Sequence, residues 1–158
     1  MCTFILGDFM DIKYMNMALK QAEKAYLNGE IPVGAVIVKN GCVISKAYNT
    51  KEKCNSAINH AEILAIIKAS KKLNNWRLND CEMYVTLEPC PMCASAIKQS
   101  RIKCVYAALE NSDTSNYEII SKIFNSDSVN PPVKFYNDIS PLRSKKLIQS
   151  FFSDRRTM

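Results

Sequence analysis

The sequence predicts an α/β fold in which helices cover a mixed β-sheet. Segments with the features of buried strands alternate along the chain with segments of helical periodicity, an order that is typical of layered α/β domains. Asn40 and Gly41 separate the first two strand-like segments, and Asn-Gly is a strong signal for a hairpin turn. We therefore expect one antiparallel hairpin, followed by strands that alternate with helices in a mixed five-stranded sheet.

The first expected element is a helix over residues 11–28. Its apolar residues recur at the spacing of a single helix face. These residues are Met15, Ala18, Leu19, Ala22 and Tyr26. Gly29 is suited to end the helix. The hairpin comes next, with strands expected over residues 33–38 and 42–48, and a polar loop covers residues 49–59.

Helices and strands are expected to alternate after this loop. The expected elements are a helix at 60–73, a strand at 82–87, a helix at 89–99, a strand at 103–109, a helix at 116–124, a strand at 133–137 and a helix from Pro141 through Phe152. The strand segments are short and rich in Val, Tyr and Phe, whereas the helical segments carry their apolar residues on one side. Pro91 is suited to the first position of the helix at 89–99.

Length and composition indicate one globular domain. The chain has 158 residues, of which 47% are hydrophobic and 23% charged. We expect a single domain over residues 11–158, preceded by a short extension at residues 1–10. No apolar run approaches the roughly eighteen residues that a membrane helix needs, so no membrane partner is expected. Seven cysteines without a framework spacing argue against a secreted disulfide scaffold and favour a cytoplasmic location.

Positive charge is concentrated near the C-terminus. The net charge of +6 permits a nucleic-acid partner without requiring one. Residues 140–158 contain five basic side chains against the single acidic Asp154. The basic residues are Arg143, Lys145, Lys146, Arg155 and Arg156. The alternative interpretation of this segment is a solvated helix face with a frayed end.

Cys90, Cys93 and His60 have the features of a metal site. The two cysteines are three residues apart at the start of an expected helix, where they share a face and where the helix dipole favours thiolates. A CxxC pair alone could equally be a redox pair or half of a structural zinc site. His60, the only histidine, adds a third ligand, and three protein ligands leave tetrahedral zinc one position for water. Cys81 and Cys104 could close the site, but their strand-like surroundings favour small buried apolar side chains.

Glu62 follows His60 by two residues, so the two side chains would diverge in the middle of a helix. Both can serve one site only if that site lies in front of the helix end. Glu62 could then act as a general acid/base on a water molecule that zinc activates, without binding the metal. The alternative role for Glu62 is an acidic residue that stabilises the first turn of the helix.

At these residues the chain resembles the cytidine deaminase-like superfamily of zinc deaminases, whose signature combines a His-x-Glu and a Pro-Cys-x-x-Cys motif. Within the superfamily it is most similar to the bacterial tRNA-specific adenosine deaminases. The stretches that carry the resemblance are "IPVGAVIV", "HAEILAI", "NWRL", "MYVTLEPCPMCASAI" and "SRI".

The resemblance implies a three-layer fold with a mixed five-stranded sheet between helices, and a homodimer. It implies hydrolysis of adenosine to inosine at the wobble position of a tRNA anticodon loop. One zinc ion per chain would be bound by His60, Cys90 and Cys93, and Glu62 would shuttle the proton. Asn49 would hydrogen-bond the flipped-out nucleoside and the backbone of Ala61 would face the base.

The resemblance also extends to the C-terminal helix, where "QSFFSDRR" is similar to the segment that grips the anticodon loop in this family. It implies RNA contacts for Phe152, Arg155 and Arg156. For Asn49 a simple turn role remains open, and one of the phenylalanines at 151 and 152 is expected to pack inside.

One segment departs from the family pattern. Where the tRNA deaminases carry a Gly/Ala-rich loop with a basic residue, residues 110–120 contain no glycine and extra acid. The departure keeps two alternatives open. One is a deaminase of free bases or nucleosides, of the guanine or cytosine type, and the other is a zinc-stabilised RNA-binding module without catalysis.

Overall fold

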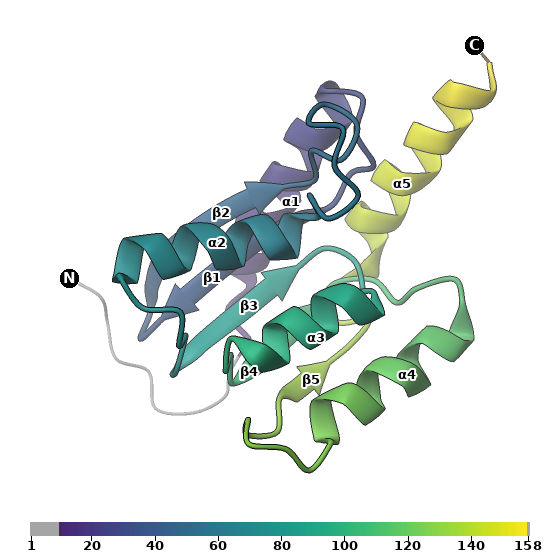
Figure 1. The fold of residues 1–158 in the computed structure, drawn as a ribbon. Helices are drawn as coiled ribbons and strands as arrows, with labels where there is room; N and C mark the ends of the chain where they lie inside the picture. Colours follow the sequence, from purple (N-terminus) through teal and green to yellow (C-terminus); the bar gives the residue numbers. More distant parts are fainter. Residues whose placement is uncertain (1–9, 158) are drawn as a thin grey trace.

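The computed structural model describes residues 10–157 and shows a five-stranded sheet between two layers of helices (Figure 1). The helices are α1 (Ile12–Leu27), α2 (Ala61–Leu73), α3 (Pro91–Gln99), α4 (Thr114–Asn125) and α5 (Pro141–Arg156). The strands are β1 (Gly34–Lys39), β2 (Cys42–Tyr48), β3 (Cys81–Val85), β4 (Cys104–Ala107) and β5 (Lys134–Tyr136). The expected α/β, three-layer architecture with a mixed sheet is confirmed.

The strand order is β2-β1-β3-β4-β5, with β1 antiparallel to both of its neighbours and β3, β4 and β5 parallel to one another. Because β2 and β3 both run opposite to β1, the ends of β2, β3, β4 and β5 all lie at the same edge of the sheet. The loops that leave this edge lead into α2, α3, α4 and α5. The starts of these helices are therefore gathered at one edge, where polar groups from distant segments can meet.

Two apolar clusters cover the two faces of the sheet. Helices α2, α3 and α4 bury one face through a large cluster that includes Ala65, Ile97 and Phe124. On the other face α1 packs on β1 and β2 and runs beside α5, and its cluster includes Met15 and Leu19. Within residues 10–157, no helix is long and apolar enough to cross a membrane.

Most element bounds agree with the sequence prediction within two residues, and two differences have structural causes. The strand expected at 82–87 ends at Val85, because after Thr86, which still donates its backbone N–H to the Gly34 carbonyl oxygen, the chain turns towards α3. The last helix continues to Arg156 rather than ending at Phe152, because contacts with α1 support its final turn. The side chain of Asp154 accepts a hydrogen bond from Tyr26. Residues 1–9 of the expected extension lie outside the described residues.

Candidate metal centre and its surroundings

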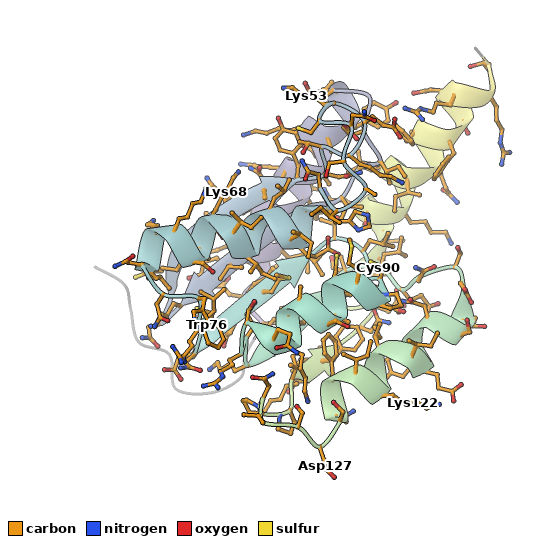
Figure 2. The ribbon with its side chains drawn as sticks, in the orientation of Figure 1. Lys53, Lys68, Trp76, Cys90, Lys122 and Asp127 are labelled. Atoms are coloured by element: carbon orange, nitrogen blue, oxygen red, sulfur yellow. The ribbon has the colours of Figure 1, made fainter. Side chains whose placement is uncertain are left out.

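Two helix starts present the expected metal ligands. His60 and Cys90 occupy the residues immediately before α2 and α3, with extended backbone conformations. Neither side chain caps its own helix by a hydrogen bond, which leaves both free to face the space between the two helix ends. Pro91 holds the first position of α3, and Cys93 lies one turn into the helix. Figure 2 shows Cys90 at this edge of the molecule, away from Trp76 at the opposite end of the sheet.

The three donor atoms fit a zinc ion. His60 Nδ1 lies 3.7 Å from Cys90 Sγ and 3.5 Å from Cys93 Sγ, and the ligand atoms of this group all lie within 4.8 Å of one another. Tetrahedral zinc with ligands at ordinary bond lengths separates nitrogen from sulfur by about 3.5 Å. Cys81 and Cys104 are buried in β3 and β4 and do not join this group. Three protein donors leave one tetrahedral position for a water molecule.

The thiol groups of Cys90 and Cys93 affect each other's ionisation. A hydrogen bond from the Cys93 side chain, supported by His60, lowers the pKa of Cys90 to about 4. The same hydrogen bond, together with burial, raises the pKa of the Cys93 thiol. The lowered pKa of Cys90 favours its thiolate form, which is the form that binds a metal. Metal binding by both sulfur atoms displaces the remaining proton, as thiolate ligation requires.

Glu62 lies beside this group but is not one of its three donors. Its side chain is only 4% exposed, and burial raises the pKa of the carboxyl to about 7. It shares a hydrogen bond with the Cys93 side chain. A buried carboxyl group with a raised pKa, beside three potential metal donors, has the properties expected of a general acid/base.

The two expected nucleoside-binding residues lie in the segments that lead to the metal group. Asn49 follows β2 and is 5% exposed, and its side-chain oxygen accepts a hydrogen bond from the Lys51 backbone N–H. This is the turn role that the sequence left open for it. Its amide nitrogen donates to the Ile31 carbonyl oxygen. Ala61 is fully buried as the first residue of α2.

The C-terminal residues divide into packed and exposed groups. Phe151 is 4% exposed, whereas Phe152 is 45% exposed, so one phenylalanine packs inside as expected. The Arg155 guanidinium lies over the Phe151 ring and donates to the Gly29 carbonyl oxygen at 2.8 Å. Arg156 is exposed. Phe152 and Arg156 are therefore better placed than Arg155 to contact a partner.

Sequence reasoning missed two buried carboxylates near the same edge. Glu30, 1% exposed, accepts hydrogen bonds from the backbone N–H groups of Glu52 and Lys53 and so holds the loop after β2. Glu88, 3% exposed, lies two residues before Cys90. Each precedes a proline closely in the chain, but this pattern alone does not distinguish a buried acid from an exposed one.

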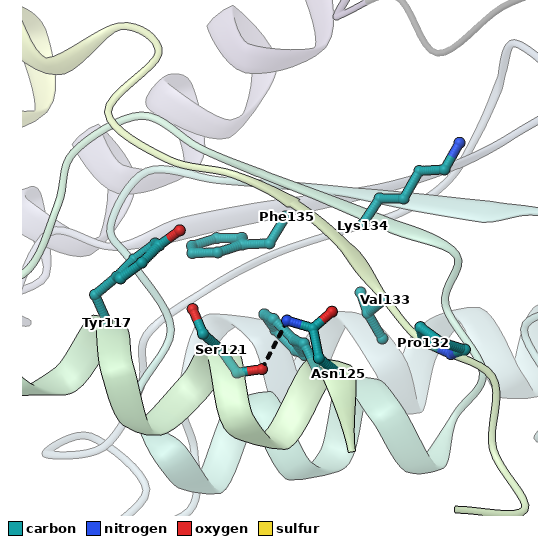
Figure 3. Close-up of a pocket in the computed structure, with 8 residues that line it drawn as sticks. Tyr117, Ser121, Asn125, Pro132, Val133, Lys134 and Phe135 are labelled. Atoms are coloured by element: carbon teal, nitrogen blue, oxygen red, sulfur yellow. Dashed lines mark hydrogen bonds between the residues drawn. The ribbon is translucent and has the colours of Figure 1, made fainter. Parts of the chain in front are cut away.

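A separate pocket of about 220 Å³ lies between α4 and β5 (Figure 3). Tyr117, Phe124 and Phe135 form its aromatic wall, and Lys134 is its single basic residue. It shares no residue with the His60, Cys90 and Cys93 group, and it lacks the donor set that would bind a metal. The chemistry is thus concentrated at the starts of α2 and α3.

Comparison with known proteins shows the family to which this chain belongs. Residues 10–109 match the model of the cytidine and deoxycytidylate deaminase zinc-binding region. A tRNA-specific adenosine deaminase of Rickettsia bellii is 42% identical over 90% of this chain and 99% of its own length.

Two solved structures extend the comparison. One, from studies of A-to-I editing by tRNA:A34 deaminases at the wobble position, is 32% identical, with a TM-score of 0.80 over 87% of this chain and 99% of that one. Guanine deaminase from Bacillus subtilis is 31% identical, with a TM-score of 0.64 over 95% and 96% of the two chains. The chain therefore belongs to the cytidine and deoxycytidylate deaminase family, among the relatives of the tRNA-specific adenosine deaminases.

Proposed function

We propose that this chain is a zinc-dependent hydrolytic deaminase that converts adenosine to inosine at the wobble position of a tRNA anticodon. The observation that carries the proposal is the group of three donors with the buried Glu62 carboxyl beside it. The similarity to tRNA deaminases supports RNA as the substrate, because the match to the tRNA-specific adenosine deaminase of Rickettsia bellii covers 90% of this chain and 99% of that protein.

His60, Cys90 and Cys93 would hold one zinc ion per chain. Bound zinc lowers the pKa of a coordinated water molecule and so supplies a nucleophile at neutral pH. Glu62 would accept the proton of the attacking water at a carboxylate oxygen and deliver it to a ring nitrogen of adenine. It would then take the second proton from the new C6 hydroxyl group and pass it to the amino group, which leaves C6 as ammonia, so that water and adenosine give inosine and ammonia.

Residues around the donors would bind and orient the nucleoside. Asn49 has unused hydrogen-bonding capacity on its amide after the turn contacts and would bind the flipped-out nucleoside. The backbone of Ala61, at the start of α2, would face the base. Phe152 and Arg156 at the end of α5 would contact the anticodon loop by stacking and by charge, with Arg155 contributing charge from its place on Phe151.

The proposed enzyme is a cytoplasmic homodimer with a single deaminase domain over residues 11–158. Light scattering coupled to size-exclusion chromatography measures its mass in solution, and metal analysis of the same sample measures zinc per chain. A monomer or a zinc content well below one per chain would contradict these parts of the proposal.

The decisive experiment offers the zinc-loaded enzyme an anticodon stem-loop RNA with adenosine at the wobble position. We expect inosine and one equivalent of ammonia, with no reaction when guanosine replaces that adenosine. Absence of inosine with zinc fully loaded contradicts the proposal.

A free-base activity is the second candidate, because the guanine deaminase of Bacillus subtilis matches nearly the whole chain at 31% identity. The same preparation is therefore tested with free guanine and cytosine. Turnover of a free base that exceeds turnover of the RNA would replace the first candidate by the second.

A further inference from the structure

Glu88 joins three loops that leave the sheet at the edge of the metal centre. Its carboxylate accepts a hydrogen bond from Asn116 Nδ2 at 2.6 Å, one from the backbone N–H of Asn111 at 3.4 Å, and one from Asn137 Nδ2. Its own backbone N–H donates to the Leu109 carbonyl oxygen at 2.7 Å. The three groups that contact this buried carboxylate are all donors, so its oxygen atoms act as acceptors in each contact.

These partners come from segments that follow three neighbouring parallel strands. Glu88 lies in the turn after β3, Asn111 in the loop after β4, and Asn137 directly after β5. Because parallel strands end at the same edge of the sheet, the Glu88 side chain in the turn after β3 can reach the segments that follow β4 and β5. Asn111 and Asn116 belong to the stretch that departs from the family pattern.

Asn116 connects this arrangement to a metal ligand. Asn116 is 6% exposed, and its amide nitrogen donates twice, to Glu88 Oε1 and to the carbonyl oxygen of Pro89 at 3.0 Å. The Pro89 carbonyl belongs to the peptide bond that precedes Cys90. Glu88 orients Asn116, and Asn116 holds the peptide group next to the ligand, so the two together fix the direction in which Cys90 leaves the backbone.

We propose that Glu88 is a positioning residue that holds the Cys90 turn in the geometry of a zinc ligand by tying it to Asn116 and Asn137. Residues that orient metal ligands through hydrogen bonds change metal affinity when they are lost. The inference rests on the proposed function only in that the site binds zinc, and not on the identity of the nucleic acid.

The test measures the zinc dissociation constant by competition with a chromophoric chelator, at a temperature where each variant is folded by circular dichroism. In Glu88→Gln an amide N–H replaces an acceptor and faces the amide donors of the asparagines, so we expect zinc affinity to fall by about tenfold or more. Glu110→Gln, an exposed carboxylate on the same stretch, is the matched control and should stay within about twofold of the parent.

A reversal variant separates positioning from general damage. Glu88→Gln combined with Asn137→Asp lets the new amide donate to the new carboxylate, while residue 137 still accepts from the Asp138 backbone N–H. We expect the double variant to regain most of the zinc affinity. Asn137→Asp alone places two carboxylates opposite each other, so we expect it to lose zinc affinity. Asn137→Ala is the milder variant, with a smaller loss, in case Glu88→Gln does not fold.

Two results would overturn the proposal. In one, Glu88→Gln lowers the melting temperature but binds zinc like the parent, which would mean a purely structural role. In the other, the reversal fails to restore zinc affinity. Because the measurement needs no RNA, an enzyme inactive on the anticodon stem-loop would refute the proposed function while this test still gave its answer.

Discussion

At the scale of residues, the position of Glu62 relative to His60 explains how two neighbouring side chains reach one site. His60 precedes α2 with an extended backbone, so its ring leaves the chain before helical geometry begins. Glu62 lies in the first turn and is buried against Cys93. A metal in front of the helix end can thus be bound by the first residue while the second remains free for proton transfer.

Replacing Glu62 with glutamine keeps the shape of the side chain and removes its proton exchange. We expect Glu62→Gln to retain zinc and to lower kcat on the anticodon stem-loop by about two to four orders of magnitude, the range for loss of a general acid/base. Single-turnover deamination and metal analysis measure the two quantities. The exposed Glu118→Gln serves as control and should react like the parent, and full activity of Glu62→Gln would show that another group moves the proton.

At the scale of elements, the close packing of α1 on β1 depends on Gly34. A Cβ atom at this position would lie 2.1 Å from the Ala18 carbonyl oxygen and 2.6 Å from the Ala22 backbone nitrogen. Both are backbone atoms on the buried face of α1, and they cannot move aside without shifting the helix as a whole. Glycine is therefore required here by the approach of two backbones and not by its own torsion angles.

Gly34→Ala should lower the free energy of unfolding by about 3 kcal/mol, the upper range for overpacking. Gly29 provides a contrast, since a Cβ there has open space but φ is +75°. Gly29→Ala should cost about 1 kcal/mol through backbone strain alone. Urea denaturation compares the two, and an equal cost for both variants would refute the packing argument.

Helix α4 ends against a buried cation from α3. Lys98 is 4% exposed, and its Nζ donates to the carbonyl oxygens of Phe124 and Ser126 at 2.9 Å each. The end of a helix leaves carbonyl groups without partners in the helix, and a lysine can bind them. Lys98 thereby fixes α4 against α3, and α4 carries Asn116 in its first turn.

Lys98→Met should lower the free energy of unfolding by about 2 kcal/mol, because two buried carbonyl groups lose a charged donor. Lys122→Met removes a lysine from the exposed face of α4, where its partner Glu118 is also exposed, and should change stability by less than about 0.5 kcal/mol. Thermal and urea unfolding of the pair provide the measurement. Equal stability of the two variants would mean that water replaces Lys98 at no cost.

At the scale of the whole molecule, α5 near the end of the described chain packs against α1 near its beginning. Arg143 forms an ion pair with Glu23 and a hydrogen bond with Asn16. Arg155 donates to the carbonyl oxygen of Gly29, just after the end of α1. Helix α5 is thus anchored along α1 over its length. Its exposed Phe152 and Arg156 therefore lie on a helix that is held against α1.

Two neighbouring phenylalanines should therefore respond differently. Phe151→Ala should reduce the free energy of unfolding by about 3 kcal/mol, because the ring is buried. Phe152→Ala, alone or with Arg156→Ala, should leave stability within about 1 kcal/mol and weaken binding of the anticodon stem-loop by about tenfold. Unfolding curves and fluorescence anisotropy with labelled RNA measure both effects, and RNA binding that is insensitive to Phe152 and Arg156 would place the contact elsewhere.

Local sequence patterns predicted much of the fold and of the candidate metal centre. The Asn40-Gly41 turn, the apolar periodicity and the proline at the start of α3 are properties of neighbouring residues, and the structure confirms the elements that they predict. The three donors were also predictable, because His60 is the single histidine of the sequence and the Cys-x-x-Cys spacing of Cys90 and Cys93 has chemical meaning. Sequence alone thus determined the order of the elements, the α/β architecture and the candidate zinc ligands.

Only the tertiary structure decided the features that depend on contacts between residues far apart in the sequence. Glu88 meets Asn137 across 49 residues and Arg155 meets Gly29 across 126, so no local pattern could have shown that the first joins three loops or that the second is held by α1. The same holds for Lys98, which resembles an exposed helix residue in sequence and is buried against α4. Burial and hydrogen-bond partners depend on which segments the sheet brings together, and only the folded chain specifies that.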